Sequence, residues 1–364
     1  MPAGRYSGIR AVTDYLYMFF AFLPFVVCLV WLAIYTADLR NERPPQRFLT
    51  LFALLCTLLY FCHSWFFVGP EEGGSWADAL YLFCNLSVYP VYYCYIRILT
   101  KDDFIWWRLA LSVLPATILT LALILTGANP AVVWTGKIVF ALEVVQVAVS
   151  GLKLLNMFDR QVENCYADTE GKTLRRISVL LVCILVTSLL STVANIIGRD
   201  GFQHSLLLGI PSILFSSMLF GVFFVGHGIR FYAYDLRLEF HRDGVEEDGA
   251  GQGEVQLEAE ISSLMAERQL FLQHGLKISD LAEQVGSNRT YVSNAINNIA
   301  GMSFSDYVNS RRIAFAKQRL AEEGDTAISQ IASESGFASF PSFYRAFVKF
   351  VGMSPSAWLK LPKR

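Results

Sequence analysis

Seven apolar stretches of similar length constrain the first 230 residues of this chain more than any other feature. A helix that crosses a bilayer needs about 20 mostly apolar residues. Because no water reaches the hydrocarbon, the backbone there must satisfy its own hydrogen bonds, which favours helices over open strands. We therefore predict transmembrane helices at residues 15–36, 48–68, 77–98, 105–126, 131–155, 174–198 and 205–229.

The composition agrees with two chemically different parts of the chain. Hydrophobic residues make up 54% of the 364 residues and charged residues 17%, against roughly 25% charged in soluble domains. The mean hydropathy is +0.41. Charged side chains concentrate after Arg230, so the net charge of −1 has to be considered by segment. We predict an all-α chain with a transmembrane domain over residues 1–241, in which the run from Tyr15 to Tyr35 is a retained helix rather than a signal peptide.

Basic residues around the predicted spans are distributed unequally between the two sides of the membrane. The first, third and fifth loops with their flanks carry eleven Lys and Arg, whereas the N-terminus and the other loops carry three. Basic residues favour the cytoplasmic side, so an odd number of spans places the N-terminus outside and the C-terminus in the cytoplasm. We predict a multi-pass membrane protein in contact with lipid. The eleven are Arg40, Arg43, Arg47, Arg97, Lys101, Arg108, Lys153, Arg160, Lys172, Arg175 and Arg176, and the three are Arg5, Arg10 and Arg199.

A few polar side chains lie within the predicted spans, where they are costly and often functional. Glu143 lies near the middle of the fifth span, and Gln146 follows one turn later on the same face. Two interpretations stay open. One is a structural role, such as a buried pair of Glu143 with Lys137 or His63, and the other is the binding of a ligand or ion by these four residues. The effector would be an unknown small molecule or lipid. Further candidates are Asn85 and Asn195.

The seven cysteines all precede residue 184, and most lie inside apolar runs. Their number is odd and their spacing matches no metal site, so free thiols are expected rather than a disulfide framework. The sequence contains no glycine-rich phosphate loop, no pair of histidines at metal-binding spacing and no plausible Ser, His and Asp set. We therefore predict neither an enzyme nor a bound cofactor or metal.

A polar segment separates the apolar part of the chain from a more charged one. Residues 242–254 are acidic and rich in glycine, a composition typical of a flexible linker. A flexible linker can bring two soluble domains close together but cannot transmit a rigid-body movement of a helix. This favours a sensor that acts through dimerisation. Apolar residues recur at helical spacing from Leu257 onward, and we predict a soluble domain over residues 255–364.

The soluble domain contains an internal repeat with a spacing of about 50 residues. Lys277–Gly286 has the sequence KISDLAEQVG, and Ala327–Gly336 has AISQIASESG. In each unit a serine can cap a short helix, a small alanine allows two helices to cross closely, and a glycine supplies the positive φ of a tight turn. These residues are Ser279, Ala282 and Gly286 in the first unit, and Ser329, Ala332 and Gly336 in the second.

The repeat continues beyond these helix-turn-helix signals. Gly301-Met302-Ser303-Phe304 matches Gly352-Met353-Ser354-Pro355, and an aromatic residue, Tyr307 or Trp358, follows each at the same distance. Val292 is expected to pack the second helix of the first unit onto the first helix. One such match would be weak, but two in register predict a domain with two helix-turn-helix motifs.

This region resembles the DNA-binding domain of the AraC/XylS transcription regulators. The resemblance covers about 255–364, under a third of the chain, and implies two helix-turn-helix subdomains joined by a long helix, here about Ser305–Glu322. Each subdomain would insert its second helix into the major groove. The usual sugar-binding cupin is absent, so the family's effector chemistry does not carry over, and the architecture is similar to that of membrane-anchored members. The most specific residues are Gly336, Phe337, Phe343, Phe347, Gly352, Ser354 and Pro355.

The resemblance also implies which side chains meet DNA. In the first reading helix, about Asn288–Asn298, base edges would be met by Thr290, Ser293 and Asn294, and phosphates by Arg289, Tyr291 and Asn297. In the second, Ser339 caps the helix. The groove-facing positions are Phe340, Pro341, Tyr344 and Arg345, with Lys349 near the DNA backbone.

Two of these side chains have the chemistry for direct base recognition. The guanidinium of Arg345 can bond O6 and N7 of guanine together, and Asn294 can similarly read adenine. Phe340 and Pro341 depart from the polar residues often found at their positions, which suggests thymine-methyl contacts or weaker specificity there. Core positions are predicted for Phe337, Phe343, Phe347 and Trp358, while Arg311 and Arg312 are either solvated or paired with acids.

We infer a one-component, membrane-embedded transcription regulator that binds double-stranded DNA, and the resemblance implies that its membrane is the inner (cytoplasmic) membrane of a bacterium. From Lys277 to Arg364 there are eleven Lys and Arg against seven Asp and Glu, a net charge of +4. This is modest for DNA binding, which depends on phosphate neutralisation, so a homodimer in the membrane would help. Two alternatives stay open: a transporter or small-molecule receptor whose C-terminal domain binds a protein, and an anchored factor released by proteolysis at the linker.

Overall fold

The computed structural model describes residues 3–37, 44–68, 75–101, 106–127, 129–197, 205–242, 253–323 and 328–360. Nearly all of these residues are helical, as predicted, and these ranges contain no β-strand. The chain divides into two compact units, one of Met1–Asn156 with Leu174–Leu238 and one of Met157–Thr173 with Glu239–Arg364. Most of the predicted linker, residues 243–252, lies outside the described residues, as do Arg40, Arg43 and Arg199 and the side chain of Asn195.

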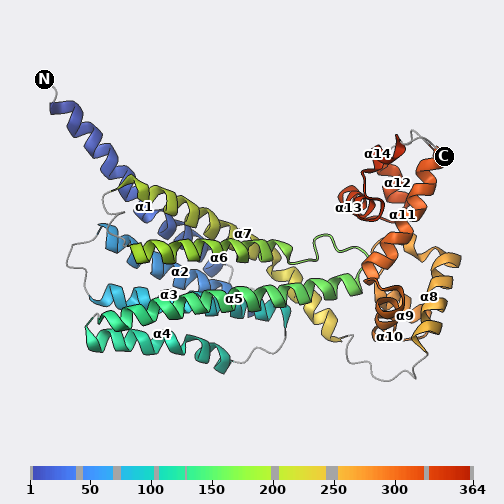
Figure 1. The fold of residues 1–364 in the computed structure, drawn as a ribbon, viewed down its shortest axis with the longest axis horizontal. Coiled ribbons are helices and arrows are strands. Elements are labelled where there is room, and N and C mark those ends of the chain that lie inside the picture. Colours follow the sequence, from blue (N-terminus) through green and yellow to red (C-terminus); the bar gives the residue numbers. More distant parts are fainter. Residues whose placement is uncertain are drawn as a thin grey trace. The chain divides into compact units, whose positions relative to one another are not determined.

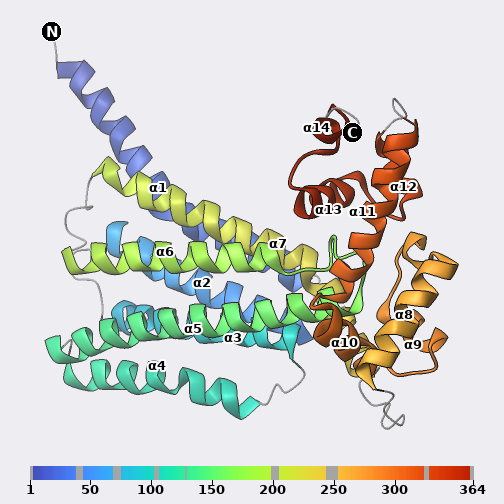
Figure 2. The same cartoon turned by 45° about the vertical axis from the view of Figure 1, so that its right-hand side comes forward.

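Seven long helices overlap the seven apolar stretches, and they run alongside one another in both views (Figure 1, Figure 2). By length and composition, five of them could cross a membrane: Val12–Ala37, Pro44–Val68, Trp107–Thr126, Pro130–Cys165 and Leu206–Gly228. The other two, α3 and α6, have similar lengths. The bounds are α1 (Ala3–Ala37), α2 (Pro44–Val68), α3 (Ser75–Thr100), α4 (Trp106–Thr126), α5 (Pro130–Cys165), α6 (Arg175–Ile197) and α7 (Gly209–Arg242).

The surface of these helices is apolar, which is the reverse of a water-soluble bundle. Only 11% of the most apolar window of α4 is buried, and its exposed side chains include Leu111, Ile118 and Leu125. By contrast, α3 buries Cys84, Tyr95 and other side chains against its neighbours. Soluble monomers rarely expose large contiguous apolar patches. This pattern therefore fits an environment of lipid around the bundle.

The second unit contains seven shorter helices (Figure 1, Figure 2). Two separate hydrophobic cores hold them together. The long helix α11 contributes Phe304 and Val308 to the first core and Ile313 and Leu320 to the second, so it joins the two halves. The bounds are α8 (Glu254–Arg268), α9 (Ile278–Gln284), α10 (Arg289–Ala295), α11 (Phe304–Glu323), α12 (Ile328–Glu334), α13 (Phe340–Val351) and α14 (Pro355–Leu359).

Both helix-turn-helix turns have the predicted glycine geometry. Gly286 has a φ of +62° between α9 and α10, and Gly336 has a φ of +84° between α12 and α13. At Gly336 a Cβ would also lie 2.7 Å from the carbonyl oxygen of Leu272, so no other side chain fits there without a shift. The crossing residues Ala282 and Ala332 are both buried, as expected.

The predicted helix starts are wrong by two residues. Ser279 and Ser329 do not cap α9 and α12, because the helices already begin at Ile278 and Ile328. At α9 the carboxylate of Asp280 accepts a hydrogen bond from the backbone N–H of Lys277 (2.9 Å) and so satisfies one free donor of the first turn. Each serine therefore lies inside the first turn.

Candidate nucleic-acid interface

The first predicted reading helix, α10, presents a short polar face. Its N-cap is Asn288, whose side-chain oxygen accepts a hydrogen bond from the N–H of Tyr291 (2.9 Å). Thr290 and Asn294 are exposed one turn apart, while Val292 on the opposite face is fully buried in the first core. The exposed pair can therefore reach a partner without disturbing the fold.

The other candidate side chains on α10 are partly buried, and some of them make contacts within the domain. Ser293 is half-buried, and its hydroxyl accepts a hydrogen bond from Nδ2 of Asn297 (3.2 Å). The ring of Tyr291 packs against the first core, so it has a structural role besides any contact with phosphate. Arg289 is half-buried at the first position of the helix. Beyond Ala295 the chain makes one wider, π-helical turn, Ile296–Ala300.

The second predicted reading helix, α13, has a sharply divided surface. Phe343 and Phe347 are fully buried, whereas Phe340 and Tyr344 are 45% and 43% exposed. The side chain of Arg345 is 61% exposed. The remaining positions are Pro341, exposed in the first turn, and Lys349, whose Nζ pairs with both carboxylate oxygens of Asp306 on α11 at 2.6 and 2.8 Å. Lys349 therefore has an internal partner in this structure.

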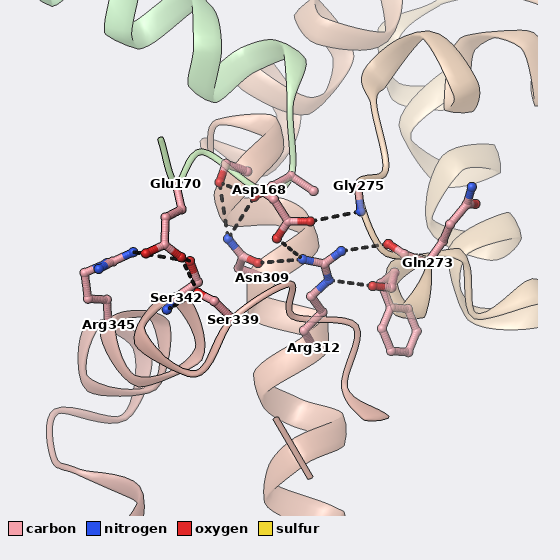
Figure 3. Close-up of polar contacts among 12 residues, drawn as sticks. Asp168, Glu170, Gln273, Gly275, Asn309, Arg312, Ser339, Ser342 and Arg345 are labelled. Atoms are coloured by element: carbon pink, nitrogen blue, oxygen red, sulfur yellow. Dashed lines mark hydrogen bonds and ion pairs between the residues drawn. The ribbon is translucent and has the colours of Figure 1, made fainter. Parts of the chain in front are cut away.

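A short segment between α5 and α6 belongs to the second compact unit, where it packs against the helices of the C-terminal domain. Figure 3 shows its Asp168 facing the buried guanidinium of Arg312 on α11. The Oδ1–Nη1 distance is 2.9 Å, and the Arg312 side chain is 0% exposed. Arg312 also donates to the carbonyl oxygens of Phe271 (2.6 Å) and Gln273 (2.9 Å). Burial lowers the pKa of Arg312, and Asp168 opposes that shift.

Backbone contacts hold the same segment, here called the docking segment (residues 166–170). The N–H of Ala167 donates to the carbonyl oxygen of Leu276 (3.0 Å). Its carbonyl oxygen accepts from Ser305 (2.9 Å) and Asn309 (3.3 Å), both on α11. Ala167 is itself a member of the first core. The docking segment is therefore built into the domain rather than resting on its surface.

The last residue of the docking segment reaches the second reading helix. The carboxylate of Glu170 accepts hydrogen bonds from the hydroxyls of Ser339 and Ser342, the latter at 2.7 Å, and lies 3.5 Å from Nη2 of Arg345 (Figure 3). These hydrogen bonds, and then the charge of Arg345, lower the pKa of Glu170. Because the shift is downward, the contact is present above the ordinary pKa of about 4.3 and is lost only as the pH falls through the lowered value.

Three residues of this arrangement were not predicted as site residues from the helix-turn-helix motif: Ser342, Asp168 and Glu170. Ser342 lies between Ser339 and Arg345 at intervals of three, so helical spacing alone places the three on one face. That signal is visible in the sequence. Asp168 and Glu170 carry no local signal, because their partners lie 144 and up to 175 residues further along the chain.

The polar candidates of the first unit do not form one cluster. Glu143 is half-buried, and its Oε2 has no hydrogen-bond partner among the described residues. Gln146 is exposed on the bundle surface, and Lys137 lies over the ring of Trp134 at 4.9 Å. His63 instead lines a cavity of about 400 Å³. The wall is largely apolar and aromatic, and it also includes Tyr60, Asn85 and Ser188.

Two helix pairs with tight glycine turns, each partly exposing its second helix, are the arrangement expected of a helix-turn-helix domain. Comparison with known proteins agrees, since residues 281–361 match a family model described as a helix-turn-helix domain. The chain thus carries a C-terminal helix-turn-helix domain of the AraC type, which confirms the predicted resemblance.

Relatives of known name share the same region. The melibiose operon regulatory protein of Escherichia coli (strain K12) is 34% identical over 89 residues, which are 24% of this chain and 29% of that protein. An uncharacterized HTH-type transcriptional regulator of Staphylococcus aureus (strain MSSA476) is 32% identical over 90 residues, 25% of this chain and 12% of that protein. This chain therefore spans less than a third of these curated relatives. The solved structure of a protein of unknown function from Listeria innocua is 28% identical, covers 29% of this chain and 96% of that one, and has a TM-score of 0.26.

Proposed function

We propose that this protein is a membrane-embedded, sequence-specific transcription regulator that binds promoter DNA with α10 and α13. The observation that carries the proposal is the pair of exposed helices in one AraC-type domain, joined through α11. Each helix would enter the major groove, with Asn294 reading adenine and Arg345 reading guanine. Phe340 and Pro341 would supply apolar contacts to thymine methyl groups.

The test of this function is selection from a random duplex pool by the full-length protein in lipid nanodiscs. Two reading helices on one DNA face predict a two-part motif, with its parts centred about 10 base pairs apart. Recovery of DNA without a shared motif would contradict sequence-specific recognition.

The proposed location is the inner membrane, with seven spans, the N-terminus outside and the DNA-binding domain in the cytoplasm. Five described helices are apolar and long enough to span. The docking segment adds support, because the loop that contains it, which with its flanks carries five of the eleven Lys and Arg, packs with the C-terminal domain in one unit, and both must then lie on the same side. A tag at the N-terminus should react with an impermeant reagent on intact cells, and labelling only after lysis would count against this orientation.

Sensing by the bundle is the second part of the proposal, and the cavity lined by His63 is the observation that favours it. Its wall is mainly aromatic and aliphatic, with His63 and Asn85 as polar contacts. Such a site suits a small, largely apolar effector or lipid with one hydrogen-bonding group. Replacing Asn85 with leucine should change the output of a promoter reporter at an unchanged protein level. Unchanged output would argue against sensing at this cavity.

Homodimerisation would strengthen DNA binding by such a modestly charged domain. Two domains held in one membrane plane experience a raised effective concentration for adjacent DNA sites. A dimer also gives the bundle a way to act, because the association of two copies would change how many domains meet one promoter. The selected DNA should then contain two copies of the motif, and a single copy would indicate a monomer.

A further inference from the structure

The first turn of α13 holds an anionic group in this structure. Ser339 and Ser342 donate hydrogen bonds to the Glu170 carboxylate, and Arg345 approaches its other oxygen at 3.5 Å. Arg345 also donates to the Ser342 hydroxyl (3.2 Å), so the donors are mutually oriented (Figure 3). The acid comes from a segment some 170 residues away in the sequence and is not part of the helix-turn-helix motif.

These donors match the chemistry of a DNA phosphate as well as that of a carboxylate. The hydroxyls of Ser339 and Ser342 and the N-terminus of a 12-residue helix are the kinds of group that bind phosphate oxygens in protein–DNA complexes. Glu170 brings a full negative charge to the face that α13 would turn toward DNA. A carboxylate seated there repels the phosphate backbone and occupies the donors.

We propose that Glu170 inhibits the second reading helix by occupying the phosphate-binding hydroxyls of Ser339 and Ser342 and by pairing with the base-reading guanidinium of Arg345, and that DNA must displace its carboxylate before α13 enters the groove. This inference rests on the proposed DNA-binding function and adds a regulatory contact to it. It also assigns Ser342 to the DNA-contacting set.

The rest of the docking segment keeps the inhibitor close. Asp168 and Ala167 are fixed to the domain by a buried ion pair and three backbone contacts. Only the exposed Glu170 side chain needs to move. The docking segment lies between α5 and α6 in the sequence. The polypeptide chain therefore connects the bundle to the C-terminal domain at this segment as well as at the 242–254 linker.

The test is the DNA affinity of the full-length protein in nanodiscs with Glu170→Gln and Glu170→Ala. Both should bind the selected duplex about twofold to tenfold more tightly than the wild type, the range expected for an exposed ion pair with added hydrogen bonds. The matched control is Glu163→Gln, which removes the same charge from an exposed position in the last turns of α5. Its affinity should equal that of the wild type. If Glu163→Gln raised the DNA affinity as much as Glu170→Gln, the loss of any negative charge would explain the effect, and the proposal would be overturned.

A double-mutant cycle tests whether Glu170 acts through the site on α13. In an Arg345→Ala background, Glu170→Gln should raise the DNA affinity by a smaller factor. The reason is that the Arg345 guanidinium, one of the donors that the Glu170 substitution frees, is then absent. An undiminished gain, or affinity unchanged by the Glu170 substitutions, would overturn the inhibitory contact while leaving DNA binding intact. If no variant, the wild type included, binds duplex DNA, the proposed function itself fails.

Discussion

Replacing Arg312 with alanine is expected to cost the C-terminal unit about 3–5 kcal/mol of stability, because it breaks a buried charge pair from one side. The substitution leaves the Asp168 carboxylate, which is 10% exposed, with a single described hydrogen bond from the N–H of Gly275 (3.0 Å). It also removes the donors to the carbonyl oxygens of Phe271 and Gln273. Hydrogen-exchange protection of the α11 backbone in the full-length protein measures the loss.

The neighbouring arginine provides the matched control. Arg311 is half-buried, with its guanidinium over the ring of Tyr307 at 3.7 Å and a hydrogen bond to Ser262 (3.2 Å). Its replacement by alanine should cost about 1 kcal/mol or less, as expected of a partly exposed cation–π contact. Equal losses for the two variants would contradict the account of Arg312 as the anchor of the docking segment.

Replacing Asn294 and Arg345 with alanine should each cost about 1–3 kcal/mol at one base position of the selected motif. The two side chains lie on different helices with separate cores, so their losses should add. The double variant is therefore expected to lose most discrimination between the selected duplex and a shuffled one. Competition binding across single-base variants of the duplex measures the effect position by position.

A phosphate contact should behave differently and serves as the control. Arg289, at the start of α10, is expected to contact the DNA backbone, so Arg289→Ala should weaken binding to selected and shuffled duplexes equally. A base preference unchanged in both Asn294→Ala and Arg345→Ala would remove these residues from the recognition set.

The positions of the helices were largely predictable because their signals are local. Span length and apolar runs located α1 to α7, and the repeated alanine and glycine located the turns at Gly286 and Gly336. The exact helix starts were not predictable from serine alone. Ile278 and Ile328 are already helical, and at α9 the capping carboxylate comes from Asp280 instead.

The docking segment shows where local signals end. The sequence left Arg312 as either solvated or paired with an acid, and the structure pairs it with Asp168, across 144 residues. No periodicity or spacing connects the loop between α5 and α6 with the middle of α11. The pairing depends on how the whole domain folds, so only the three-dimensional structure places Glu170 on α13.

The most direct test of the central claim is the affinity of the full-length protein in nanodiscs for the selected and the shuffled duplex, measured at 50 and 200 mM salt. We predict that the selected duplex binds roughly 10³-fold more tightly or better at the same salt concentration. We also predict that both affinities fall as salt rises, because phosphate contacts release counterions. Equal affinity for the two duplexes, or no binding to either at the lower salt, would contradict the account of this protein as a sequence-specific DNA-binding regulator.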